Sequence, residues 1–117
     1  MKKFEFLEHT ADVYIASYGK TIEEAFENAA IAMFEVMTDT NKIDPKFEDS
    51  ILVKAEDDSS LLYNWLEALL VYFEVKNKLL SKFKILYILK KSGSLILKAK
   101  IYGESFNPKK HLQKVGV

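Results

Sequence analysis

The chain has 117 residues, a length typical of one domain, so a second independent core is not expected. Hydrophobic residues make up 49% and charged residues 29% of it, the balance of a soluble globular protein, and no apolar run approaches the roughly 20 residues of a membrane helix. The chain has no cysteine, which excludes disulfides, thiol nucleophiles and cysteine-ligated metal sites. A cytoplasmic location follows as a default, because acidic residues also interrupt any apolar signal-like stretch at the start.

Charge is distributed unevenly along the chain. Residues 1–60 carry six lysines and fourteen acidic residues, a net charge of −8, whereas residues 61–117 carry eleven lysines and three glutamates, a net charge of +8. All 17 basic residues are lysines. Arginine is the usual bidentate reader of guanine edges, so its absence argues against sequence-specific DNA binding. Lysines could still hold a phosphate backbone without sequence preference.

The first predicted elements are two short strands. Residues 4–8 alternate between apolar and charged side chains, and residues 13–18 are rich in β-forming types. Residues 9–12 break the pattern between them, and Gly19 with Lys20 closes the second strand.

A helix is predicted next. The Thr21 hydroxyl can accept from the Glu24 amide, and the Glu24 carboxylate can reach back to the Thr21 amide, as in a capping box. The helix is expected to run to about Met37, because apolar residues then recur at helical spacing: Ile22, Phe26, Ala29, Met33 and Met37.

A polar connection separates this helix from a strand at residues 50–55. Residues 57–60 supply possible N-caps for a second helix over residues 61–74, whose apolar face is wide enough to lie against a sheet. Glu67 within that helix is expected to be an exposed acid about one turn from Tyr63.

The last predicted strands, residues 83–89 and 95–102, flank a hairpin turn at residues 90–94. Residues 103–117 are polar and are expected to be irregular. The order β-β-α-β-α-β-β predicts an α+β fold, with two helices packed on a largely antiparallel sheet.

The sharpest candidate site is the connection between the first two strands. Asp12 offers hard oxygen ligation for Ca²⁺ or Mg²⁺, and His9 could be an acid, a base or a softer ligand. The competing interpretation is turn chemistry, in which Asp12 and Thr10 satisfy local backbone amides. Ca²⁺ needs roughly six to eight oxygens, so other segments would have to contribute.

A second candidate lies near the end of the chain. Lys109 and Lys110 beside His111 could grip a phosphate or an acidic partner, although a solvated terminal loop would look the same. His9 and His111 could also enter one pocket if the chain returns to the 8–12 turn. The paired acids Asp57 and Asp58 are better explained by helix capping. The sequence holds no Gly-rich phosphate loop, no His-Glu-x-x-His motif and no Gly-x-Ser-x-Gly elbow.

The chain contains the motif Glu8-His9-Thr10-Ala11-Asp12-Val13, followed by the helix start Thr21-Ile22-Glu23-Glu24-Ala25-Phe26. With these two motifs at this distance from each other, the chain resembles the archease family. Residues 57–70 and 103–111 are similar to later family blocks, so the resemblance covers nearly the whole chain in order. Residues 1–117 are therefore expected to form a single archease-like domain.

The resemblance implies a helper protein in tRNA processing, not an enzyme by itself. Archeases act with the GTP-dependent RNA ligase of tRNA splicing, promoting transfer of GMP to the ligase's active-site histidine and repeated turnover. The expected partner is that ligase, with RNA contacted indirectly and with no membrane or DNA.

The resemblance also implies a divalent cation, Ca²⁺, bound through Asp12. Glu8, His9, Thr10, Glu104, Lys110 and His111 are the expected partner-binding or site-lining residues. Family chains continue beyond the block at Lys110 and His111 with acidic C-terminal ligands, whereas this chain stops at Val117. The resemblance therefore implies a C-terminally short domain and an incomplete cation site.

Two other functions stay open on the residues alone. One is a basic RNA-binding module that presents tRNA halves with the +8 half of the chain. The other is a small metal-dependent hydrolase built on His9, Asp12 and His111.

Overall fold

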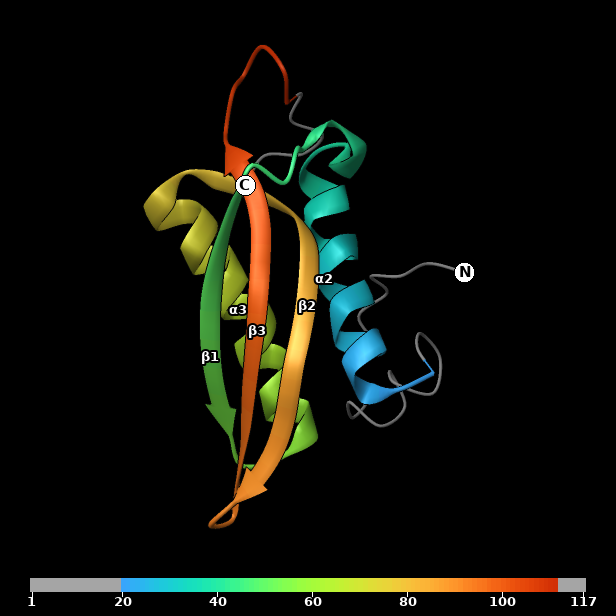
Figure 1. The fold of residues 1–117 in the computed structure, drawn as a ribbon, viewed down its shortest axis with the longest axis vertical. Helices are drawn as coiled ribbons and strands as arrows, with labels where there is room; N and C mark the ends of the chain where they lie inside the picture. The colour runs from blue at the N-terminus through green and yellow to red at the C-terminus, as the bar shows by residue number, and fades with distance from the viewer. Residues whose placement is uncertain (1–19, 112–117) are drawn as a thin grey trace.

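The computed structural model describes residues 20–111, which form two long helices and a three-stranded antiparallel sheet of order β1-β3-β2 (Figure 1). The predicted α+β class is confirmed. The strands predicted at residues 4–8 and 13–18, and the connection between them, lie outside the described residues. The elements in chain order are α2 (Ile22–Met37), the 3-10 helix η1 (Thr40–Lys42), β1 (Phe47–Ala55), α3 (Asp58–Lys76), β2 (Lys78–Lys91) and β3 (Ser94–Ser105).

Helix α2 begins with a cap that differs by one residue from the prediction. The Thr21 hydroxyl accepts from the Glu24 amide at 3.0 Å, as expected. The Glu24 carboxylate, however, accepts from the amide of Lys20 at 3.1 Å instead of that of Thr21. Both bonds satisfy donors near the helix start, so the capping role is retained.

Helix α3 is longer than predicted, but its capping was predicted correctly. The Asp57 carboxylate accepts from the Ser60 amide at 2.8 Å. At the other end Asn77 adopts a left-handed conformation with φ of 53°, a common way to end a helix. Glu67 is exposed, as expected.

Strands β2 and β3 form the predicted hairpin, with positive φ angles at Ser92 and Gly93 in the turn. The expectation that residues 103–117 are irregular is wrong for the first three of them, which continue β3. Gly103 pairs with Leu80 on one side and with Phe47 on the other. Pairing on both sides therefore outweighs the weak strand propensity of Gly103 and its neighbours.

In Figure 1 α3 lies behind the sheet and α2 lies alongside β2. The buried side chains of both helices and of all three strands form one hydrophobic core. Along β3, Leu97, Ala99 and Ile101 are buried toward the helices. Trp65 of α3 donates from Nε1 to the Phe26 carbonyl of α2 at 3.0 Å, which ties the helices together. The residues that alternate with the buried ones along the strands point away from the helices. The side of the sheet that they form is called here the outer face.

The helices within residues 20–111 fall short of the length and apolarity required to cross a membrane.

Candidate functional site

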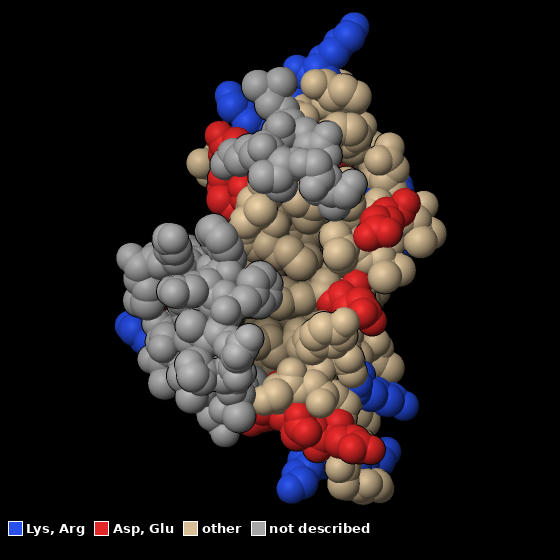
Figure 2. Space-filling model, turned by 180° about the vertical axis from the view of Figure 1, so that it is seen from behind, with Lys and Arg blue, Asp and Glu red and all other residues tan. Residues whose placement is uncertain are grey.

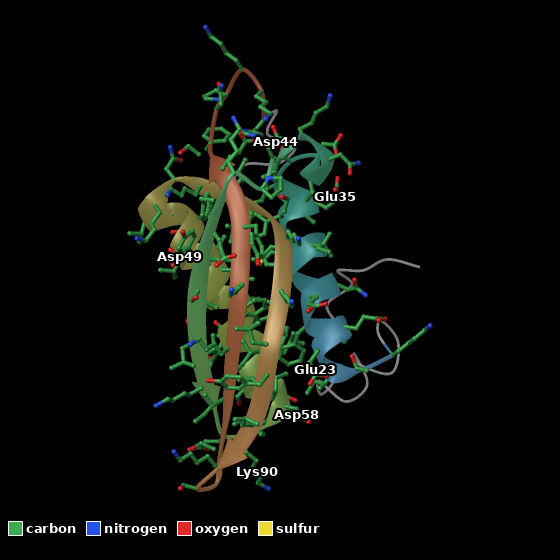
Figure 3. The ribbon with its side chains drawn as sticks, in the orientation of Figure 1. Glu23, Glu35, Asp44, Asp49, Asp58 and Lys90 are labelled. Carbon is green, nitrogen blue, oxygen red and sulfur yellow. The ribbon has the colours of Figure 1, made fainter. Side chains whose placement is uncertain are left out.

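The most polar buried position in the described part of the chain is at the end of β3. Glu104 is 7% exposed, although glutamate is seldom buried without partners. Two other segments approach it, the connection from η1 to β1 and the turn that follows β3. Figure 3 places Asp44 of the first segment at this same end of the sheet. Glu104, with Asp44, Lys46, Lys110 and His111, is called here the Glu104 cluster.

The turn after β3 is closed by Asn107. Its carbonyl accepts from the amides of Lys110 at 3.0 Å and His111 at 2.7 Å. Its side-chain oxygen accepts from the amide of Lys109 at 3.0 Å. Asn107 and Pro108, at the start of this turn, are of types that favour turns, and the turn reverses the direction of the chain. The reversal brings Lys110 and His111 back onto Glu104.

Four groups donate to the Glu104 carboxylate or pair with it. Its Oε2 accepts from the Asp44 amide at 2.7 Å and from Lys110 Nζ at 2.7 Å. His111 Nε2 lies 3.1 Å from the same oxygen. Lys46 Nζ lies 3.5 Å from Oε1. The buried carboxylate is thus satisfied, as a buried charge must be.

These contacts set the protonation of the cluster. Burial by itself would raise the pKa of Glu104, but hydrogen bonds from Lys110, the Asp44 amide and His111 outweigh it and lower that pKa to about 2. Hydrogen bonds to Asp44 and Glu104 raise the pKa of Lys110. The carboxylate and the ammonium are therefore both charged at neutral pH.

His111 has both ring nitrogens engaged. The Asn107 amide donates to Nδ1 at 2.9 Å, so Nδ1 carries no proton and Nε2 is the nitrogen that donates to Glu104. The ring is 1% exposed and stacks on Phe106, with centroids 6.1 Å apart. His111 thus has no free nitrogen for a substrate, and a hydrolase that uses His111 as its base is not supported.

A hollow of about 580 Å³ opens beside the cluster. Lys46 and Lys78 supply its positive charge, and the Lys78 ammonium lies 4.4 Å from the centre of the Phe47 ring. Glu104 also lines it, but that carboxylate is already neutralised by its partners. Because Lys46 is one of those partners, the Lys78 ammonium is the charge that remains at the hollow, and it favours an anionic group, such as a carboxylate or phosphate, as an occupant. The hollow is lined by Lys46, Phe47, Lys78, Glu104, Ser105, Phe106, Asn107 and Pro108.

The described residues do not form a cation site. Within residues 20–111, no three His, Asp or Glu side chains gather as metal ligands would. Glu104 faces ammonium, imidazole and amide donors, which a divalent cation would have to displace. Asp12, the predicted ligand, lies outside the described residues, so its role stays a prediction.

The structure brings together the candidate residues from near the end of the sequence, and it adds two residues, Asp44 and Lys46, that the sequence did not single out. Glu104, Lys110 and His111 meet as a cluster, whereas Glu8, His9 and Thr10 lie outside the described residues. Asp44 and Lys46 were missed because they are about 60 positions from Glu104 in the sequence. Pro45 between them marked only a polar connection.

Comparison with known proteins places this arrangement in a family. The sequence pattern of the Archease protein family matches residues 4–117. The chain belongs to the archease family.

Relatives support this membership over most of the chain. Protein archease of Sulfurisphaera tokodaii is 50% identical over 95% of this chain and 78% of its own length. Protein archease of Pyrococcus furiosus is 46% identical over the same shares. The solution structure of protein 1598 from Methanobacterium thermoautotrophicum superposes with a TM-score of 0.75 at 38% identity, over 100% of this chain and 82% of that one.

Membership in the archease family supports an accessory role in RNA processing over catalysis by the chain itself. The region matched to the family includes the whole Glu104 cluster.

Proposed function

We propose that this archease is an accessory activator of the GTP-dependent tRNA-splicing RNA ligase. In this role it promotes transfer of GMP to the ligase's active-site histidine and so supports repeated turnover. Membership in the archease family supports this class of partner. The observation that carries the proposal is the Glu104 cluster beside a lysine-lined hollow, because its ammonium groups are held in fixed positions while both ring nitrogens of His111 are engaged.

The cluster is suited to docking because its charges are held in place. The buried Glu104 carboxylate positions Lys110, whose side chain is 34% exposed and still reachable from solvent. Lys46 and Lys78 lie at the adjoining hollow. Preorganised ammonium groups stabilise an anionic partner group without the entropy loss of ordering long side chains. An acidic side chain of the ligase or a nucleotide phosphate at its active site has the required charge.

The proposal includes a divalent cation, Ca²⁺, bound through Asp12. Such an ion would supply charge neutralisation for a phosphoryl group. Calorimetric titration of the chain with CaCl₂ tests this part separately. Heat of binding that is lost in Asp12→Asn supports the ligand role, whereas equal heats for the two proteins contradict it.

Guanylylation of the cognate ligase tests the main proposal. Purified ligase is incubated with labelled GTP and a substoichiometric amount of this protein, and the covalent ligase–GMP adduct is measured over time. The native chain is expected to accelerate adduct formation, and Asp12→Ala is expected to reduce that effect. No acceleration by the native chain would end the proposal.

The role of the cluster needs a matched pair of variants. Lys110→Gln removes the ammonium that Glu104 holds, whereas Lys109→Gln removes an exposed neighbouring charge. We expect several-fold weaker stimulation with Lys110→Gln and native stimulation with Lys109→Gln. Circular dichroism checks that both variants are folded. Equal stimulation of the ligase by the two variants would show that the Glu104 cluster has no part in ligase activation.

A further inference from the structure

The outer face of the sheet carries five lysines that the Glu104 cluster does not use. Strand register brings them together from all three strands. Lys84 of β2 pairs with Lys100 of β3, and Lys82 pairs with Tyr102. On the other side of β3, Lys98 pairs with Leu52 of β1. The set, called here the basic sheet face, consists of Lys54, Lys82, Lys84, Lys98 and Lys100.

These lysines are weakly neutralised. Lys100 pairs with Glu48 at 3.4 Å, and the two side chains are 39% and 51% exposed. Within residues 20–111, no carboxylate lies within ion-pair distance of the other four lysines. Like charges directly opposite each other, as at Lys84 and Lys100, destabilise a sheet. An anionic ligand would relieve that repulsion.

An exposed aromatic ring lies among the lysines. Tyr87 is 36% exposed and pairs with Lys98 across the strands. Leu89, two residues further along β2, is 54% exposed, and Leu52, which flanks Lys98 from β1, is 55% exposed, so exposed apolar side chains alternate with the lysines. At the end nearer the Glu104 cluster, the Lys82 ammonium lies 4.9 Å from the centre of the Tyr102 ring. Lysines with an exposed aromatic ring match the phosphates and bases of an unpaired strand.

The opposite side of the molecule differs in charge. Figure 2 shows Asp and Glu spread over the described surface on the helix side, while lysines project chiefly from its ends and edges. The opposite charges of the two halves of the sequence are thus partly separated in space. A polyanion would be attracted to the sheet side and repelled by the other.

We propose that the basic sheet face binds single-stranded RNA through its phosphates, with a base stacked on Tyr87. Lysines on alternate residues of a strand are about 7 Å apart, and they sit on a rigid scaffold. Sheets with exposed aromatic rings are a known platform for unpaired RNA bases. An acidic protein surface would satisfy the lysines but would leave the exposed ring unexplained. Without arginine, binding is expected to be independent of sequence.

The inference does not depend on ligase activation, because the basic sheet face and the Glu104 cluster are separate sets of residues. Formation of the ligase–GMP adduct can be measured without RNA. A variant of the basic sheet face is therefore expected to lose RNA binding while retaining its stimulation of guanylylation. Failure of either proposal can thus be seen without the other.

The test is fluorescence anisotropy with a labelled 20-nucleotide oligouridine over a series of KCl concentrations. If about four phosphates are contacted, the slope of log K against log[salt] is expected to be about −3. Lys84→Gln/Lys98→Gln is expected to bind about ten-fold more weakly in low salt, with a slope shallower by about 1.4. Tyr87→Leu is expected to weaken binding about five-fold or more at an unchanged slope.

The control is Lys20→Gln/Lys42→Gln, which removes two exposed lysines near the ends of α2 and changes net charge equally. It is expected to lose much less affinity than the double variant of the sheet face. Equal losses, or a native chain without salt-dependent RNA binding, would overturn the proposal. So would a sheet-face variant that binds RNA normally but fails to bind a polyglutamate probe, since that result would identify an acidic protein surface as the ligand.

Discussion

His111 Nε2 lies 3.1 Å from Glu104 Oε2, and both side chains are buried at the end of β3. The other ring nitrogen accepts from the Asn107 amide, so the histidine connects the turn to the strand. Each contact depends on the other, because the turn must reverse before the ring can reach the carboxylate. His111 therefore has a structural role, holding the turn against β3, which its residue type alone did not indicate.

Glu104→Gln is expected to lower the free energy of unfolding by about 1–3 kcal/mol, because it weakens hydrogen bonds to a buried charged group. Urea denaturation monitored by circular dichroism measures the change. Asp44→Asn is the control, since that side chain is 56% exposed where it pairs with Lys110. It should lose less than about 1 kcal/mol. Similar losses of stability in the two variants would show that the burial of the Glu104 carboxylate contributes little to the free energy of unfolding.

Stability is expected to fall in acid because of Glu104. Its pKa is lowered from 4.5 to about 2 in the folded chain. The unfolded chain therefore binds a proton more readily, and the stabilisation is present above pH 4.5 and lost as the pH falls toward 2. Urea unfolding at several pH values measures the slope. The native chain should lose more stability across this window than Glu104→Gln, and parallel curves would contradict the lowered pKa.

Gly103→Ala is expected to destabilise the chain by about 3 kcal/mol or more, or to prevent folding. A Cβ atom at this position would lie 1.8 Å from the Leu79 carbonyl oxygen, a backbone atom that cannot move without opening the β2–β3 pair. Thermal unfolding of the two glycine variants provides the comparison. In Gly93→Ala the added Cβ would lie near no atom within 4 Å, so the only strain is that of an alanine at a φ of +80°. This strain should lower the free energy of unfolding by about 1 kcal/mol. The prediction fails if Gly93→Ala is the more damaging change.

Trp65→Phe is expected to lower stability by about 2–4 kcal/mol. It removes the donor to the buried Phe26 carbonyl and leaves a cavity where the larger ring was fully enclosed. Tyr63→Phe, two residues earlier on the same helix, changes a side chain that is 65% exposed. That control should stay within about 0.5 kcal/mol of the native chain in chemical denaturation. A neutral Trp65→Phe would show that the interhelical bond is dispensable.

Local sequence signals predicted most of the described fold. Thr21 and Asp57 are typical caps and both cap helices, since capping depends on residues three positions apart. The hairpin turn at residues 90–94 was also predicted, because Gly93 can adopt the positive φ that a tight turn requires. The ends of the last two strands were not predicted, because pairing partners distant in sequence determined them.

The candidate site was only partly predictable. Lys110 and His111 were candidates from the residues alone, Glu104 was added by the family resemblance, and the roles of all three as partner-binding residues stay predictions. Asp44 and Lys46 gave no local signal, because a backbone amide and a surface lysine become site residues only when a distant carboxylate faces them. The basic sheet face had a weak signal in the charge of the second half, which holds four of its five lysines but could not show that they share one face with Lys54.

The sequence by itself determined the helices, the hairpin, the family and the excess of lysine in the second half, since each depends on residue types at short spacing. Tertiary structure alone decided that Glu104 is buried, that Asp44 and Lys46 reach it, and that lysines of three strands lie side by side. These properties depend on strand register and on chain reversal at Asn107, which bring together residues separated by tens of positions.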